Sequence, residues 1–305
     1  MESVAGLTSV IVVACNSGAL LADCVASVLG STTPVEVFVS DNDSRDGSIE
    51  ALQTRWPELR VLRNGTNLGF GAACNRAAAQ ARGDMLLFLN PDCRIEADAI
   101  ARLRACVDAR TGVLGASIIG VDGKSEAASR RRDPLLWRAL MTATGLARFE
   151  SRWPALAGAN LPENSAAPAR EDVDAVSGAL MLVPRAAFAR IGGFDEDYFL
   201  HFEDMDLCRR ARDLELQVAC ANDVRVTHVK GTSSRARPFF VARHKHAGMW
   251  RWFVKFDPAA RNPLLRGLAW CGIWVHYAAM TPSYAWRCFA RTSLLPLAGE
   301  GAGGG

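Results

Sequence analysis

The chain has 305 residues, of which 50% are hydrophobic and 22% are charged, and its formal net charge is +3. This composition excludes an intrinsically disordered chain and supplies enough apolar material for one large core or two smaller ones. The small net charge argues against a nucleic-acid partner, since basic residues gather only around 130–132 and 235–246. Nine cysteines without a CxxC pair, and no apolar leader, indicate reduced thiols in the cytoplasm.

Strand-like and helix-like segments alternate from residue 9 to residue 119. The segments are SVIVVAC, ALLADCVASVL, VEVFVSD, SIEALQTRW, LRVLRN, GAACNRAAAQA, MLLFLNPD, EADAIARLRACV and VLGASII. They predict four βα units on a mainly parallel sheet, which is an α/β fold. Ligands of such sheets bind outside the carboxyl ends of the strands, so the residues that follow each strand are the candidate binding residues.

The remainder of the chain divides into four parts. Residues 122–172 lose the alternation and carry RRRDP and several prolines, which predicts a variable, partly flexible insertion without clear strands. Residues 173–235 predict a mixed α/β half that completes a domain of residues 1–235, whose nucleotide-binding half spans about 8–120. A helical region follows at 236–294, and the glycine-rich tail 295–305 is expected to be disordered.

The helical region is aromatic and basic. About 18 largely apolar residues with Arg266 and His276 among them are borderline for a spanning helix, because an arginine at mid-bilayer costs a few kcal/mol. We therefore expect helices lying in the membrane interface, and the alternative is that they pack on the protein's own core. The tryptophans expected at headgroup depth are Trp250, Trp252, Trp270 and Trp274.

The first two polar clusters follow strands in the nucleotide-binding half. VSDNDSRDGS begins with Asp41 and Asn42, and a carboxylate there can accept hydrogen bonds from a base or ribose, or can cap the following helix. NGTNLGFGAACN places Asn67, Gly69 and Asn75 around the start of a small-residue helix, which suits a diphosphate or ribose contact, or a plain turn.

The next clusters carry the candidate metal and base residues. MLLFLNPDC ends a strand with Asn90 and Asp92, and a hard divalent cation takes one or two carboxylate oxygens and keeps water and phosphate oxygens in its other positions. GGFDEDYFLHFEDMDLCRRARD supplies Glu203 and Asp204 at a helix start, where a base could take a proton from a sugar hydroxyl. His228 ends a later strand and could complete the metal shell. The aromatic residues Tyr198, Phe199 and Phe202 could form the wall of a sugar site.

Taken in order, these clusters resemble glycosyltransferase family 2, and within it the bacterial rhamnosyltransferase-like branch that builds cell-wall linkers and the O-antigen of lipopolysaccharide. The resemblance covers about residues 8–235. It rests on SVIVVACN, VSDNDSRDGS, NLGFGAACNRA, FLNPD, SGALMLVPRAAF, GGFDEDYFLHFEDMDLCRRAR and HVKGTSS.

The resemblance implies a GT-A fold, a nucleotide diphospho-sugar donor and Mg²⁺ or Mn²⁺. It implies that Asp92 binds the metal, that His228 contacts the metal or the diphosphate, and that Asp204 acts as the catalytic base beside Glu203. Ser177, Gly178 and Phe202 are expected on the acceptor side. The residues expected to bind the nucleotide are Asn16, Asp41, Asn42, Asn67, Gly69, Asn75 and Asn90. The carboxylate–x–carboxylate metal motif of this fold is here Asn90–Pro91–Asp92.

The sequence therefore predicts an inverting glycosyltransferase that moves a sugar, by resemblance L-rhamnose from dTDP-rhamnose, onto a glycan or lipid-linked acceptor in cell-envelope synthesis. We expect a cytoplasmic protein held peripherally on the inner membrane. The alternatives are a transferase that uses a UDP- or GDP-sugar and a non-catalytic, membrane-associated sugar-nucleotide-binding protein. A nucleotidyltransferase is disfavoured, because CNSGALLAD after the first strand lacks a basic residue.

Overall fold

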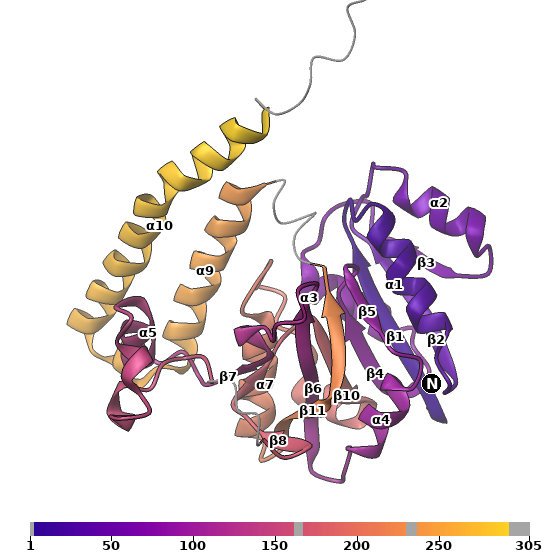
Figure 1. The fold of residues 1–305 in the computed structure, drawn as a ribbon, viewed down its shortest axis with the longest axis horizontal. Helices are drawn as coiled ribbons and strands as arrows, with labels where there is room; N and C mark the ends of the chain where they lie inside the picture. Colours follow the sequence, from indigo (N-terminus) through magenta and orange to yellow (C-terminus); the bar gives the residue numbers. More distant parts are fainter. Residues whose placement is uncertain (1–2, 162–166, 230–236, 293–305) are drawn as a thin grey trace, which may run out of the picture.

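The first half of the chain folds into the predicted alternation of strands and helices. The computed structural model describes residues 3–161, 167–229 and 237–292 (Figure 1); the tail 295–305 and residues 230–234 of the HVKGTSS motif lie outside them. The strands are β1 (Val4–Ala14), β2 (Val35–Asp41), β3 (Arg60–Arg63) and β4 (Gly83–Leu89), and the helices between them are α1 (Ala19–Leu29), α2 (Ser48–Arg55) and α3 (Phe70–Ala78).

All but two of the strands in the described residues belong to one nine-stranded sheet. Its order is β3-β2-β1-β4-β10-β6-β11-β5, and β8 pairs with β11. The further strands of this sheet are β5 (Cys93–Ile95), β6 (Thr111–Gly120), β8 (Arg170–Asp172), β10 (Leu180–Pro184) and β11 (Gln217–His228). Strands β1 to β4 are parallel, as predicted, whereas β10 runs antiparallel between β4 and β6.

Helices cover both faces of the sheet. Along β1, Val10 and Val12 pack with α1, α2 and α4 (Ala99–Ala105), whereas Ile11 and Val13 pack with α3, α6 (Arg185–Ile191) and α7 (Glu203–Asp213). Successive side chains of a strand point to opposite faces, so a strand covered on both sides is apolar throughout. This burial explains the continuous apolar run at the end of β1, which is followed by polar residues where the strand ends.

The insertion is more regular than the sequence predicts. It contains η1 (Ala127–Ser129), β7 (Arg130–Arg131), α5 (Leu136–Ala143), η2 (Leu146–Phe149) and η3 (Pro154–Leu156). Strand β7 pairs with β9 (Ala175–Val176) in a separate two-stranded sheet. The prediction of no clear strands was wrong here, because a two-residue strand is too short to show a period of two.

Two helices, α9 (Pro238–Phe256) and α10 (Pro263–Thr292), end the described chain and pack side by side, with η4 (Pro258–Arg261) between them (Figure 1). The placement of Trp252 at the membrane interface was wrong, because this side chain is 1% exposed and belongs to the core on the α7 face of the sheet. Trp270 is exposed. No helix of the described residues is long and apolar enough to cross a bilayer.

Candidate active site

Hydrogen bonds join the loops that follow the first three strands. Asn16 donates its backbone N–H to Ser44 Oγ at 3.0 Å and accepts from the Arg45 N–H at 2.8 Å. Asp41, which is buried, accepts from the Ser44 N–H at 3.0 Å, and its other carboxylate oxygen lies 3.9 Å from Arg63. Asp41 thus shapes its own turn, which is the structural alternative that the sequence left open, while remaining at the end of β2.

The amide of Asn42 connects this region to the loop before α3. Its nitrogen donates to the Gly69 carbonyl at 3.0 Å and to Asn67 Oδ1 at 3.1 Å, and its oxygen accepts from Asn64 Nδ2 at 2.8 Å. A buried, fully bonded amide holds its neighbours in one geometry. The strand ends at 42 and 64–69 therefore form one rigid rim, as expected for neighbouring parallel strands.

Gly69 brings this rim against the loop that precedes α7. It has a φ of +85°, and a Cβ there would lie 2.4 Å from the Phe199 carbonyl oxygen. The next N–H, of Phe70, donates to that oxygen at 3.0 Å. Asn75 accepts from the Phe194 N–H and donates to the Phe194 carbonyl, both at 2.9 Å, so its amide braces the acidic loop instead of pointing to a ligand.

The candidate base lies at the start of α7 in a tightly fixed position. His201 and Phe202 both have positive φ, 68° and 72°, which is uncommon for side-chain-bearing residues and marks a constrained turn. Asp204 is 8% exposed; its Oδ2 accepts from the Gly178 N–H at 3.0 Å and forms an ion pair with Arg131 of β7. A Cβ on Gly178 would lie 3.2 Å from Asp204 Cβ, so this close approach needs a glycine.

Glu203 differs from its neighbour Asp204 in its surroundings. It is 6% exposed, and its Oε2 has no hydrogen-bond partner among the described residues. Burial, and then the adjacent Asp204, raise the pKa of Glu203 to about 8. Glu203 is therefore protonated at neutral pH, whereas Asp204 has the cationic partner that a carboxylate requires.

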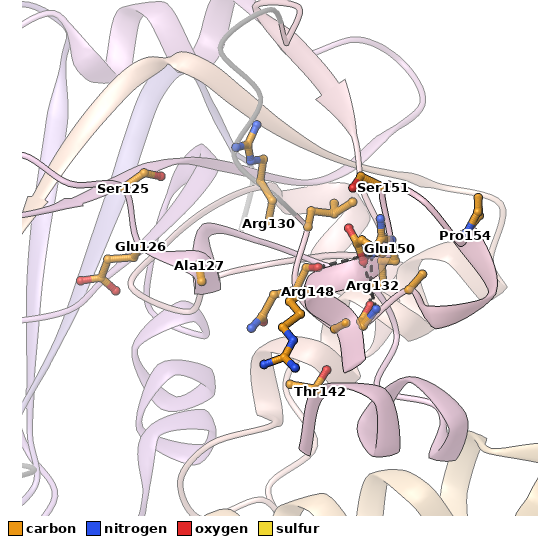
Figure 2. Close-up of a pocket in the computed structure, with 15 residues that line it drawn as sticks. Ser125, Glu126, Ala127, Arg130, Arg132, Thr142, Arg148, Glu150, Ser151 and Pro154 are labelled. Atoms are coloured by element: carbon orange, nitrogen blue, oxygen red, sulfur yellow. Dashed lines mark hydrogen bonds and ion pairs between the residues drawn. The ribbon is translucent and has the colours of Figure 1, made fainter. Parts of the chain in front are cut away.

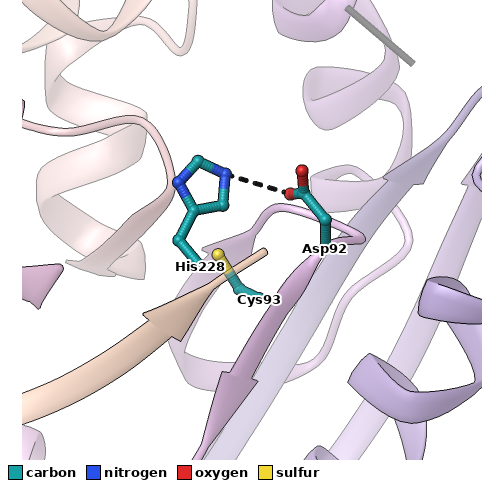
Figure 3. Close-up of side chains that lie close together, drawn as sticks. All are labelled: Asp92, Cys93 and His228. Carbon is teal, nitrogen blue, oxygen red and sulfur yellow. Dashed lines mark ion pairs between the residues drawn. The ribbon is translucent and has the colours of Figure 1, made fainter. Parts of the chain in front are cut away.

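His228 lies between two carboxylates at the end of β11. Its Nε2 is 3.1 Å from Asp92 Oδ1 (Figure 3), and its Nδ1 is 3.1 Å from Glu126 Oε1. Burial alone would lower the pKa of His228, but Asp92 and Glu126 outweigh burial and raise it. The structure thus brings together the two predicted metal-binding residues, and it adds Glu126 from the insertion.

The donor atoms at this position fit a hard divalent cation. Asp92 and His228 each offer one atom, and two neighbouring ligands of an octahedral ion at about 2.1 Å lie about 3 Å apart, which matches their 3.1 Å separation. The Cys93 sulfur is also near. However, burial raises the pKa of the Cys93 thiol far above its usual value, and the sulfur lies 3.6 Å from the Ala179 carbonyl oxygen, within hydrogen-bond range. Cys93 is therefore a packing residue.

The metal-binding candidates and the candidate base are linked through one short stretch of chain. The Asn90 N–H donates to the Ala179 carbonyl at 3.0 Å, and Leu89 pairs with Leu180 in the sheet. One residue earlier, the Gly178 N–H bonds to Asp204. The Asn90 turn and Asp204 therefore lie on the two sides of residues 178–180, where the acceptor side is expected. Ser177 Oγ accepts from the Ala179 N–H at 3.2 Å and stabilises this turn.

Several side chains of the acidic loop and of the predicted aromatic wall have structural partners. Asp195 pairs with Arg251 and Lys255 of α9, and the fully buried Asp206 pairs with Lys255 and Arg210. Tyr198 is 2% exposed and lies beneath Arg251, so its predicted place in a sugar-binding wall was wrong. Phe199 stacks on His244 at 4.5 Å, and Phe202 contacts α9 at Gly248. The acidic loop is thus largely fastened to α9.

Two cavities meet at Glu126. The larger has a volume of about 620 Å³ and lies within the insertion (Figure 2), where Arg130, Arg132, Arg148 and Glu150 contribute to its wall. The smaller, of about 510 Å³, is lined by Lys124, Glu126 and His228 among others. Arg132 pairs with Glu150 at 3.1 Å, whereas Arg148 has no carboxylate partner among the described residues.

Comparison with known proteins identifies the class of the protein. The glycosyl transferase family 2 model matches residues 9–159. An N-acetylglucosaminyl-diphospho-decaprenol L-rhamnosyltransferase of Mycobacterium tuberculosis is 32% identical over 265 residues, which cover 78% of this chain and 85% of the relative. The chain belongs to glycosyltransferase family 2, and it is a glycosyltransferase related to rhamnosyltransferases.

Solved structures agree on the fold. GalNAc-T7 with UDP, GalNAc and Mn²⁺ aligns with a TM-score of 0.60 at 18% identity, over 95% of this chain and 58% of that one. The mannosyltransferase PcManGT of Pyrobaculum calidifontis, in complex with GDP-Man and Mn²⁺, aligns with a TM-score of 0.52 at 18% identity, over 95% and 76%. The predicted GT-A fold is confirmed.

Sequence reasoning missed Glu126 and Arg131. Both lie in the insertion and act through partners 102 and 73 residues away, His228 and Asp204. The RRRDP run was the available signal, since three adjacent arginines inside a domain require counter-charges.

Proposed function

We propose that this protein is an inverting, metal-dependent glycosyltransferase in which Asp204 takes the proton of the acceptor hydroxyl. The observation that carries the proposal is the contact of residues 178–180 with the Asn90–Pro91–Asp92 turn on one side and with Asp204 on the other. A single displacement needs a donor diphosphate and a base beside the same acceptor hydroxyl, and we propose that Asp92 and Asp204 serve these two groups. The candidate base must be held in one position, and Asp204 is held by the Gly178 N–H and by its ion pair with Arg131.

Asp92 and His228 would hold Mg²⁺ or Mn²⁺ on the donor diphosphate. When bound, such an ion neutralises charge that develops on the leaving diphosphate. Glu126 orients the imidazole by bonding its second nitrogen. The strand-end rim of Asn16, Asp41, Asn42, Asn67 and Gly69 is proposed to receive the nucleotide.

The proposed donor is dTDP-rhamnose, and the similarity to the mycobacterial rhamnosyltransferase supports this choice. A UDP- or GDP-sugar is the alternative, since neighbours of the same fold were solved with UDP and with GDP-Man. A non-catalytic binding protein would have no use for a buried carboxylate, positioned by an arginine and a glycine, at the site of the base.

The proposed acceptor is a lipid-linked glycan of the cell envelope, presented at the inner membrane, which is the class of acceptor named for the mycobacterial relative. The insertion cavity supports an acceptor with a charged or hydroxylated part, because arginines, hydroxyls and backbone groups line it. Strand β7 directs Arg131 to Asp204 and places Arg130 and Arg132 at this cavity. Asp204 would therefore lie on one side of β7, and a non-reacting part of the acceptor would bind in the cavity on the other side.

A panel of nucleotide sugars tests the proposal. We expect Mn²⁺-dependent transfer from dTDP-rhamnose to an N-acetylglucosaminyl-diphospho-polyprenol, and at least a hundredfold lower kcat in Asp204→Asn, because general-base catalysis contributes about 10²–10⁴-fold. Binding of dTDP, measured by calorimetry, should remain close to normal in this variant. Unchanged turnover of Asp204→Asn, or transfer insensitive to EDTA, would contradict the assignment.

A further inference from the structure

Exposed large apolar side chains are concentrated in two segments of the described chain. One segment belongs to the insertion, with Trp137, Leu140, Leu146, Phe149 and Trp153. The other is the first part of α10, with Leu264, Leu265, Leu268, Trp270 and Val275. On soluble monomers, exposed large apolar residues usually occur singly, so a cluster of them indicates a contact surface.

Three of the exposed apolar residues of α10, Leu264, Leu268 and Val275, lie along one side of the helix. Leu264, Leu268 and Val275 are 71%, 60% and 66% exposed, and their spacings of four and seven residues place them in one stripe. The opposite side of α10 packs on α9, where His276 Nδ1 lies 2.9 Å from His246 Nε2. The stripe therefore faces away from the protein.

The two segments adjoin. The N–H of Leu136, at the start of α5, donates to Asp257 Oδ2 at 2.6 Å, and the other oxygen of Asp257 accepts from the Ala259 N–H at 2.8 Å. Asp257 thus fastens α5 to the turn that leads into α10, and Figure 1 shows α5 beside the first turns of α10. Together, residues 137–153 and 264–275 form what we call the apolar face.

The charge around the apolar face indicates its partner. From residue 258 to residue 299 the sequence has four arginines and no aspartate or glutamate. In the insertion, Arg148 lies over the Phe149 ring at 4.6 Å and Arg152 over the Trp153 ring at 6.0 Å, while the acidic Glu150 is paired with Arg132. Apolar side chains surrounded by arginines, without exposed acids of their own, complement a bilayer with anionic headgroups.

We propose that the apolar face is a membrane-docking surface for anionic lipid bilayers, and that the insertion supplies half of it. This inference deepens the proposed function, because a lipid-linked acceptor would be reached from the docked protein. The larger cavity is lined by residues 147–158 of the same segment, including Arg148, so docking would place this cavity close to the headgroups.

Flotation of the full chain with vesicles tests this surface without any sugar nucleotide or acceptor. The vesicles contain phosphatidylcholine alone or an equal mixture with phosphatidylglycerol. We expect binding to the mixture and a loss of about tenfold in the partition coefficient for Leu140→Ser/Phe149→Ser and for Leu264→Ser/Leu268→Ser. Val4→Ser/Leu29→Ser, which changes comparably exposed residues on β1 and α1, is the matched control and should bind as the wild type does.

Three results would overturn the inference. One is the absence of binding to the anionic vesicles, and another is normal binding by the insertion variant together with an unchanged melting temperature. The third is a dimer in light scattering that the same substitutions dissociate, since a second copy would then cover the face. Transfer to a detergent-soluble acceptor, measured in parallel, reports on the proposed function separately, because it needs no vesicle.

Discussion

The Arg131 guanidinium and the Asp204 carboxylate form an ion pair that joins the insertion to helix α7, across 73 positions of sequence. Arg131 also donates to the Val176 carbonyl at 3.0 Å, so a single side chain holds the insertion, β9 and the candidate base together. The insertion therefore helps to hold the candidate base in position.

Loss of this ion pair should destabilise the protein. Arg131→Met leaves a largely buried carboxylate without its counter-ion, and we expect a decrease of about 3 kcal/mol in the free energy of unfolding. Urea unfolding followed by circular dichroism measures it. Arg60→Met, which removes an exposed partner of Glu36, is the control and should cost less than about 1 kcal/mol. If both variants lost the same free energy of unfolding, Arg131 would contribute no more to stability than an exposed surface charge does.

Removal of the Glu126 carboxylate should weaken metal binding more than it weakens the folded state. Glu126→Gln keeps the size of the side chain but no longer offers a carboxylate to His228 Nδ1, and we expect Mn²⁺ affinity to fall about 10- to 100-fold. Calorimetric titration with Mn²⁺ and dTDP measures this. Glu150→Gln, in the same insertion but paired with Arg132, should leave the affinity unchanged. An unaltered affinity in Glu126→Gln would exclude the orienting role.

The protonation of Glu203 predicts a pH dependence of stability. Its pKa in the folded protein is about 8, raised by burial and by Asp204, whereas an exposed glutamate titrates near 4.3. Between these two pKa values the folded state keeps a proton that the unfolded state releases. The contribution of Glu203 to the free energy of unfolding is therefore full below about pH 4 and is lost as the pH rises towards 8. Glu203→Gln cannot ionise, and its free energy of unfolding should fall less between pH 5 and 8 than that of the wild type.

Urea titrations at a series of pH values compare the two proteins. Asp213→Asn, at the exposed end of the same helix, is the control and should follow the wild-type curve. Parallel curves for Glu203→Gln and the wild type would show that Glu203 titrates normally in the folded protein.

Arg148 should affect the acceptor and leave the donor unaffected. Arg148→Ala removes a cavity arginine that has no carboxylate partner among the described residues, so folding should change little. We expect the KM for a diphosphate-linked acceptor to rise about tenfold, since a charge-assisted hydrogen bond contributes about 1.5–3 kcal/mol. The KM for dTDP-rhamnose should remain the same. A rise in the donor KM instead would place the donor in the insertion.

The sequence predicted the parts of the molecule that depend on local patterns. The apolar runs of β1, β2 and β4 are buried on both faces, and polar residues appear where the strands end, so the fold and the strand-end residues could be inferred. Asp92 and His228, both predicted beside strand ends of one sheet, lie 3.1 Å apart in the structure. Glu126, Arg131 and Trp252 were misjudged because their partners are distant in the chain, and no local period reports such contacts.

Helix α9 supplies counter-ions to the loop that leads into α7. Arg251 and Lys255 reach Asp195, Lys255 also reaches the buried Asp206, and Gly248 lets α9 approach the His201 carbonyl. A protein trimmed at residue 236 to obtain a compact catalytic fragment would lose these cations and the buried Trp252 indole together. We expect such a fragment to misplace Glu203 and Asp204, so inactivity after truncation would reveal nothing about the need for a membrane.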